Sequence, residues 1–426
     1  MAESGNPGRN EAFRYWLRLG FVNFGGPAGQ IAIMHRDLVD DRKWISEERF
    51  LRALNFCMLL PGPEAQQLAT YVGWRLHGLA GGLAAGGFFV LPSAVLLFGL
   101  SWSYAVWGTL PAAAGLLAGL KAAVVAVLIQ ALWRIGTRAL RGPVEWVLAA
   151  GAALALALGG VPFPVVVAAA LASGWLLNLA GWRAEGPASS AADAPAARPP
   201  DAAAARRGHP LAILATGLLL WFAPIAAAAL VLGPDHVVTR AGLFFSGAAV
   251  VTFGGAYAVL GYVSQHAVNH LGWLTTAQMM DGLGLAETTP GPLIMVLQFV
   301  GFMAGWNAPG GLAPLAAAAL AAAITTWVTF LPSFLFIFIG GPFIERMRPA
   351  GRAAAALAAT TAAVVGVIAH LGGVFALHAL LPGGAPHTGL ILLSLISLAL
   401  LVRTKVPMPA VILLAAAAGW LLFTPN

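Results

Sequence analysis

Long apolar runs follow one another along the chain, and polar residues gather in the short stretches between them. A run of about 20 apolar residues is long enough to cross a hydrocarbon core about 30 Å thick. Runs of this kind lie at residues 82–104, 111–133, 210–232, 312–339 and 406–423. They are rich in Leu, Ala and Gly and do not alternate with a period of two, which favours helices over a β-barrel. The pattern predicts an all-α polytopic membrane protein.

Composition supports a chain embedded in a lipid bilayer. Charged residues make up 9% and hydrophobic residues 59% of the sequence, whereas roughly a quarter of the residues of a soluble domain are charged. The net charge of +7 is carried by Arg residues in short loops beside apolar runs, which indicates membrane topology rather than a nucleic-acid partner. Cys57 is the single cysteine, which excludes a disulfide framework and a thiolate metal site.

One unit of sequence occurs twice. At one constant offset, Phe24-Gly25-Gly26 returns as Phe253-Gly254-Gly255, and Pro61-Gly62-Pro63 returns as Pro290-Gly291-Pro292. After a short insertion, Leu91-Pro92-Ser93 returns as Leu331-Pro332-Ser333. We therefore divide the chain into an N-terminal repeat (11–182), an Ala/Pro/Arg-rich linker (183–209) and a C-terminal repeat (210–426), which opens with an added helix at 210–232.

The added helix predicts that the second copy is inserted upside down, because it contributes a single extra crossing. Loop charges agree with this. Basic residues gather in the linker and at 134–141, 345–352 and 403–405, whereas the loops at 105–110, 264–278 and 378–388 carry neither Lys nor Arg. By the positive-inside rule, the chain consists of two inverted-topology repeats.

Each copy is also interrupted, because Pro-Gly-Pro cannot continue an α-helix. Broken backbone at membrane depth must line a cavity or be buried in protein, so we expect discontinuous or re-entrant helices. If the broken elements dip and return, the charged loop at 35–52 is cytoplasmic. If every apolar segment crosses, about thirteen crossings result and this loop is external; its five basic residues favour the re-entrant version.

Interrupted helices at matching positions of inverted repeats are typical of secondary-transporter binding sites near the bilayer midplane. The half-helices that start after Pro63 and Pro292 present unpaired N–H groups and a partial positive charge, which attract an anion. Two such ends facing each other would hold a small oxyanion. The alternative is that both breaks are kinks that allow tight helix packing.

Ionisable residues within apolar segments are further candidates. Lys121 lies about ten residues, or about 15 Å, into its helix and would hold a dianion, or else snorkel or pair with a helix end. Glu287 is the preferred proton carrier over Glu64, whose place in a first helical turn would repel an anion. Asp281 is interpreted as the end of an external loop. His266 and His270 have metal-site spacing, but no third ligand is nearby, so we predict neither a metal nor a cofactor.

At several places in both halves the sequence resembles the chromate ion transporter family. The motifs are Asn23-Phe24-Gly25-Gly26-Pro27-Ala28, His35-Arg36-Asp37-Leu38-Val39 with Trp44, Leu60-Pro61-Gly62-Pro63 with Gln67, and the stretches 253–260 and 287–292. The resemblance covers nearly the whole chain. It implies a long-chain, two-domain member that exports chromate across a bacterial inner membrane with proton-motive energy. It also carries functional weight to Asn23, Gly25, Gly26, His35, Asp37, Trp44, Pro61, Gly62, Pro63, Gly254, Gly255, Glu287, Pro290, Gly291 and Pro292.

Other functions stay open at this stage. Sulfate matches chromate in shape and charge, so uptake of sulfate or another oxyanion is one alternative, and a passive anion channel is another. A membrane enzyme is disfavoured because no nucleophile stands at motif spacing from a base. Without a nucleotide-binding loop, the expected partners are an oxyanion, protons and lipid. Whether the chain forms a homo-oligomer is left open.

Overall fold

The computed structural model describes residues 7–24, 26–182, 210–252, 256–343 and 351–424, and these residues form helices joined by short loops, without a strand among them. Five helices are long and apolar enough to cross a membrane. They are α4 (Glu64–Trp107), α5 (Pro111–Ala139), α9 (Pro210–Leu232), α14 (Pro314–Gly340) and α15 (Arg352–Leu380). The prediction of an all-α polytopic membrane protein is confirmed.

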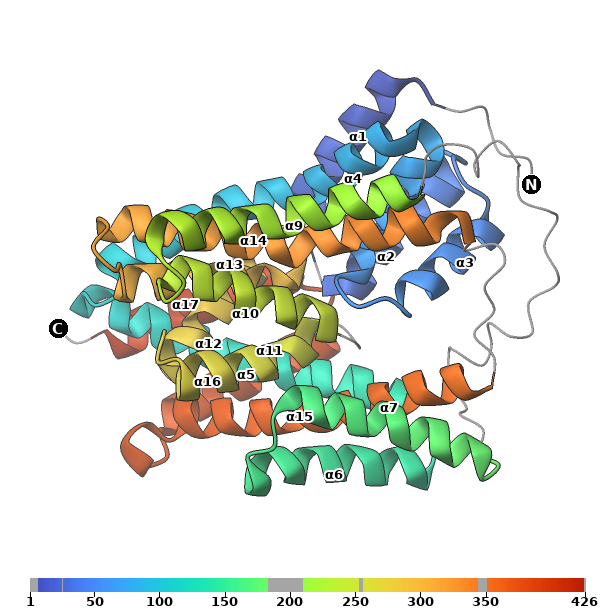
Figure 1. The fold of residues 1–426 in the computed structure, drawn as a ribbon. Helices are drawn as coiled ribbons and strands as arrows, with labels where there is room; N and C mark the ends of the chain where they lie inside the picture. Colours follow the sequence, from blue (N-terminus) through green and yellow to red (C-terminus); the bar gives the residue numbers. More distant parts are fainter. Residues whose placement is uncertain (1–6, 25, 183–209, 253–255, 344–350, 425–426) are drawn as a thin grey trace.

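Helices stack in three layers (Figure 1). α4, α9 and α14 run along one side, and α15 lies on the other side with α6 (Pro143–Gly159) and α7 (Phe163–Leu179). Between them lie α5 and the shorter helices α10 (Val237–Val251), α11 (Ala256–Ser264), α12 (Thr276–Thr288), α13 (Val296–Asn307), α16 (Thr388–Arg403) and α17 (Met408–Phe423). Small residues let the middle helices approach closely: a Cβ on Gly119 of α5 would clash with the Ala415 carbonyl oxygen of α17.

The first broken elements form two helical hairpins. α1 (Arg9–Val22) and α2 (Gly26–His35) are antiparallel, because Arg42, beyond α2, contacts Glu11 at the start of α1 at 3.2 Å. α4 bends at His77 and Gly78, and we call residues 64–77 its first arm. α3 (Glu47–Cys57) and this first arm form the second hairpin. That arm ends at His77, where Nε2 lies 3.0 Å from the Pro7 carbonyl oxygen, before α1. Both hairpins thus return to the end of the molecule where they begin.

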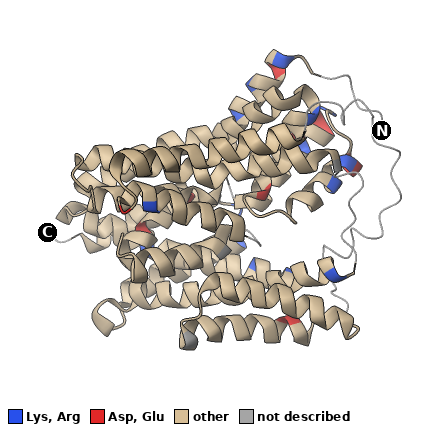
Figure 2. Ribbon diagram, in the orientation of Figure 1, with Lys and Arg blue, Asp and Glu red and all other residues tan. Residues whose placement is uncertain are grey.

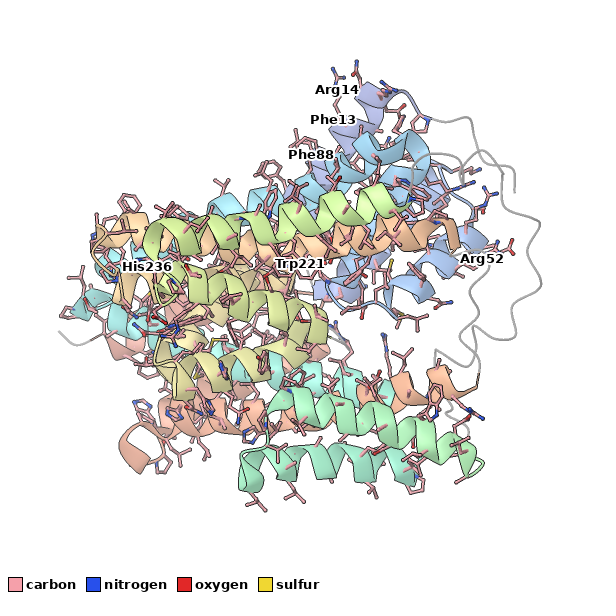
Figure 3. The ribbon with its side chains drawn as sticks, in the orientation of Figure 1. Phe13, Arg14, Arg52, Phe88, Trp221 and His236 are labelled. Atoms are coloured by element: carbon pink, nitrogen blue, oxygen red, sulfur yellow. The ribbon has the colours of Figure 1, made fainter. Side chains whose placement is uncertain are left out.

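The second copy repeats this arrangement. His236, before α10, places Nε2 3.3 Å from the carbonyl oxygen of Pro309, beyond α13. Asn307, at the end of α13, donates a 2.9 Å hydrogen bond to the carbonyl of Trp273, before α12. Arg52 of the first copy and His236 of the second lie at opposite ends of the molecule (Figure 3). This is the geometry expected of the re-entrant alternative.

Equivalent long helices of the two copies run in opposite directions. In α4 and α14, Gly82 faces Phe338 and Gly86 faces Phe334, so the two helices are antiparallel. In α5 and α15, Gly136 faces Val365, whereas the later Gly372 faces Leu128. Lys and Arg residues gather at the end of the molecule that carries α1 to α3 (Figure 2). Each of these two pairs of equivalent helices is therefore antiparallel.

Candidate functional site

The two Pro-Gly-Pro breaks meet in the interior through a reciprocal pair of hydrogen bonds. The N–H of Gly62 donates to the Thr252 carbonyl at 2.9 Å, and the N–H of Gly291 donates to the Asn23 carbonyl at 2.8 Å. Gly62 and Gly291 hold equivalent positions in the repeat, as do Asn23 and Thr252. Each break is therefore fixed by the other copy, which is the relation that a pseudo-twofold axis produces.

Glycine is required in the middle of each break. Gly62 has φ 116° and Gly291 has φ 108°, a region that side chains strongly disfavour. A Cβ on Gly62 would lie 2.7 Å from Ser333 Oγ, and one on Gly291 would lie 2.6 Å from Ser93 Cβ. These serines belong to the repeated Leu-Pro-Ser motifs. The Leu-Pro-Ser segment of each copy thus packs against the broken backbone of the other copy.

A narrow cavity lies between the breaks. Its volume is about 10 Å³, and it is lined by Pro27, Gln30, Pro63, Glu64, Ala65, Ala256, Pro292, Leu293 and Ile294. The starts of α2, α4 and the short helix η4 (Leu293–Met295) converge here, so partial positive charge from helix N-termini is directed at one space. The volume suffices for about one water molecule. A tetrahedral oxyanion can enter only when the breaks move apart.

Buried amides surround the breaks. Gln30 is 1% exposed, and its Nε2 donates to the Gly291 carbonyl at 2.6 Å. Gln67 Nε2 donates to the Pro61 carbonyl at 2.8 Å. The side-chain amide of Asn23 is fully buried and has no hydrogen-bond partner among the described residues. Because buried polar groups are normally paired, Asn23 is a candidate ligand donor.

Both candidate proton carriers lie near the breaks. Glu64 lines the cavity. Glu287 is 5% exposed and accepts a 2.8 Å hydrogen bond from the Tyr257 hydroxyl. Tyr257 lies two residues after Phe253-Gly254-Gly255, and its place beside that motif is the sequence signal that could have identified it.

Lys121 does not line this cavity. Its Nζ lies 3.3 Å from Asp281 Oδ1, and Tyr104 donates a 2.9 Å hydrogen bond to Oδ2 of the same carboxylate. Asp281 is 1% exposed within α12. The interpretation of Asp281 as the end of an external loop is therefore wrong, since α12 begins at Thr276 and carries this residue into the interior.

The remaining predicted residues lie elsewhere or outside the description. His35 contacts Asp40 at 3.4 Å and Glu47 at 3.8 Å, and Asp37 pairs with Arg36 at 3.0 Å. The buried ring of Trp44 packs edge-on against Tyr15 with centroids 5.3 Å apart. His35 thus joins the end of α2 to the start of α3, and Trp44 packs on α1, so these two residues hold the first hairpins together and do not line the cavity. Gly25, Gly254 and Gly255 lie outside the described residues.

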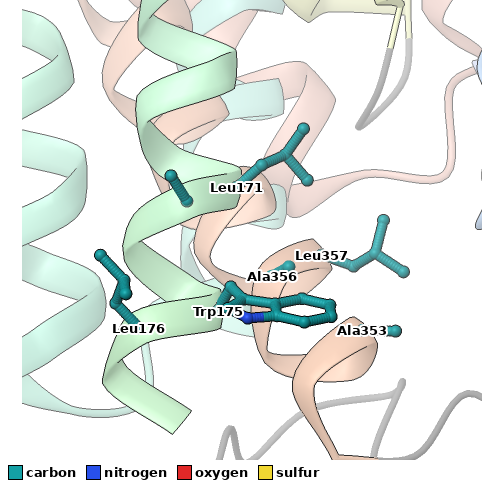
Figure 4. A pocket seen from close by; sticks show the side chains of 7 residues that line it. Leu171, Trp175, Leu176, Ala353, Ala356 and Leu357 are labelled. Atoms are coloured by element: carbon teal, nitrogen blue, oxygen red, sulfur yellow. The ribbon is translucent and has the colours of Figure 1, made fainter. Parts of the chain in front are cut away.

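Two further features offer no oxyanion site. His266 stacks on His270 with ring centroids 5.0 Å apart, and burial, followed by the charge of His270, lowers the pKa of His266. No group of three metal-binding side chains occurs among the described residues. A groove of about 630 Å³ between α7 and α15 is lined only by apolar and aromatic side chains, including Trp175 and Leu357 (Figure 4).

Discontinuous helices whose N-terminal ends converge between two copies of a repeat are typical of membrane transport proteins. More narrowly, the chain belongs to the chromate transporter family, whose model, described as "Chromate transporter", matches residues 10–175 and 239–420.

Relatives match along most of the chain. It is 35% identical to the chromate transport protein of Pseudomonas aeruginosa over 375 residues, which cover 84% of this chain and 79% of the relative. It is 28% identical to the chromate transport protein of Cupriavidus metallidurans over 360 residues, or 83% and 79%. It is also 28% identical to the probable chromate transport protein of Synechococcus elongatus over 407 residues, or 95% and 93%. No solved structure matches.

Proposed function

We propose that this protein exports chromate across a bacterial inner membrane by alternating access, with energy from the proton gradient. The observation that carries the proposal is the reciprocal contact of the two Pro-Gly-Pro breaks beside one buried cavity. The relatives named as chromate transport proteins support chromate as the cargo.

The arrangement of helices supports inverted repeats. Equivalent helices α4 and α14, and α5 and α15, run antiparallel. We place the basic end of the molecule, with the loop at 35–52, in the cytoplasm. The five long helices and the shorter α6, α7, α16 and α17 then cross the membrane, while α1 to α3 and α10 to α13 dip in from opposite sides. Rocking of one copy against the other would expose the cavity to each side in turn.

Electrostatics favour export. Moving one elementary charge across 100 mV is worth about 2.3 kcal/mol, so a dianion leaving a negative interior gains about twice that amount.

Glu287, buried and hydrogen-bonded to Tyr257, is the proposed carrier of the coupled proton, with Glu64 as the second candidate. The helix starts at α2 and α4 and the free amide of Asn23 would hold the oxyanion.

Replacing the break-forming prolines tests the proposal. In Pro61→Ala and Pro290→Ala the helix can continue through the break, so we expect chromate uptake into inverted vesicles and chromate export from intact cells to fall at least about tenfold. Membrane insertion should be unchanged. Pro224→Ala is the matched control, because this proline lies inside the long helix α9, away from the breaks. Wild-type export by both Pro61→Ala and Pro290→Ala would overturn the site assignment.

Flux measurements in intact cells separate the alternatives. Radiolabelled sulfate that moves inward without any change in chromate accumulation would identify a sulfate uptake protein. Chromate flux that never proceeds against a gradient would identify a passive channel.

A further inference from the structure

A guanidinium group lies beside the broken backbone of the first copy. Arg134 is carried by α5, and its Nη2 lies 3.9 Å from the position that a Cβ on Gly26 would occupy. Gly26 is the first residue of α2 and has φ 68°. The next residue, Pro27, lines the cavity between the breaks. A full positive charge thus adds to the partial charge of a helix start at the edge of this cavity.

Among the described residues, no contact neutralises the charge of Arg134. Its guanidinium makes neither an ion pair nor a hydrogen bond within the part of the chain that the structure describes. Its charge reaches the Tyr257–Glu287 pair electrostatically, without a direct contact. The side chain is only partly exposed. A cation held in an apolar helix without a partner is costly, and an anionic ligand would remove this cost.

The other cation of α5 is in a different position. Lys121 is already paired with Asp281 at 3.3 Å, so an oxyanion would have to displace a carboxylate to bind it. Arg138, one turn beyond Arg134, is exposed near the end of the helix. The position of Arg134 in the second copy is taken by Val374, so packing of the repeat does not itself require a cation there.

We propose that Arg134 binds the transported oxyanion and selects for tetrahedral dianions, an inference that rests on the proposed function. The planar fork of a guanidinium donates two parallel hydrogen bonds to two oxygens of one anion. The backbone N–H groups at the start of α2 would bind a further oxygen. Monovalent anions gain less from the same charge.

Equilibrium binding of radioactive chromate to the purified, lipid-reconstituted protein tests this. We expect Arg134→Gln to weaken chromate binding at least about tenfold, the loss of one charge-assisted pair. Arg134→Lys keeps the charge but loses the fork, so it should bind with intermediate affinity. Arg138→Gln is the matched control on the same helix and should bind like the wild type.

Thermal unfolding separates a binding role from a structural one. Without anion, Arg134→Lys should unfold at the wild-type temperature, but chromate should raise this temperature less than in the wild type. Wild-type affinity in both Arg134 variants would overturn the inference while leaving chromate transport intact. A wild-type protein that binds sulfate but not chromate would instead overturn the proposed cargo, and loss of sulfate binding in Arg134→Gln would then still support the site.

Discussion

At the scale of single residues, the breaks depend on two glycines that carry a positive φ and sit against a serine. Gly62→Ala and Gly291→Ala add a methyl group where Ser333 Oγ or Ser93 Cβ stands within 2.7 Å. We expect each variant to lose roughly 2–4 kcal/mol of stability through backbone strain and overpacking, measured as thermal unfolding in detergent. Gly87→Ala, in α4 with open space around it, is the control and should be neutral. Wild-type stability in both variants would contradict the described backbone.

The sequence could identify these glycines because they occur twice in the same setting. It could not identify Arg134, which stands near an Arg-rich turn and was grouped with it. The helix continues to Ala139, so Arg134 lies within the span. Nor could it pair Gln30 with Gly291, because that contact joins residues 261 apart. A contact between residues far apart in the chain leaves no pattern in the sequence around either of them.

At the scale of elements, the pair between Lys121 of α5 and Asp281 of α12 ties a spanning helix to a half-helix. Removing one partner of a buried pair leaves an uncompensated charge and costs about 3–5 kcal/mol. We therefore expect Lys121→Met and Asp281→Asn each to unfold at lower temperature, and the double variant to recover most of the loss. A double variant as unstable as the sum of the singles would show that the pair is not coupled.

The same variants test the prediction that Lys121 holds the oxyanion. If the double variant is stable and still binds chromate, Lys121 serves the α5–α12 contact instead. The sequence places Asp281 at a loop end because the preceding stretch, 264–278, carries neither Lys nor Arg and offers no apolar run that would extend over this residue. A capping box of Thr275 and Gln278 starts α12, and this Thr-x-x-Gln pattern was a readable signal for the helix.

The positions of the long helices and of the helix breaks could be predicted from the sequence. Apolar length identified the long spans, and Pro-Gly-Pro identified where helices stop. The sequence predicts that the long apolar run begins only at residue 82, and the structure has a bend just before it, at His77 and Gly78 inside α4. Here the turn lets the first arm of α4 end the hairpin before the long span begins.

At the scale of the whole molecule, inversion can be tested with the chain's own pseudo-symmetry. Asp40 and Asn269 occupy equivalent, exposed positions in the two copies. In a Cys57→Ala background, we expect an impermeant thiol reagent to label Asp40→Cys only from the cytoplasmic side and Asn269→Cys only from outside. Thr404→Cys, in the basic loop after α16, is the cytoplasmic reference. Labelling of both test positions from one side would overturn the inverted topology.

The crossed bonds from Gly62 to Thr252 and from Gly291 to Asn23 make the halves mutually dependent. If the chain were cut within the linker, neither half alone could pair the N–H of its own central glycine. The carbonyl that accepts each of these hydrogen bonds belongs to the other half. In the intact chain the two halves are covalently joined, so the linker raises the effective concentration of each half near the other.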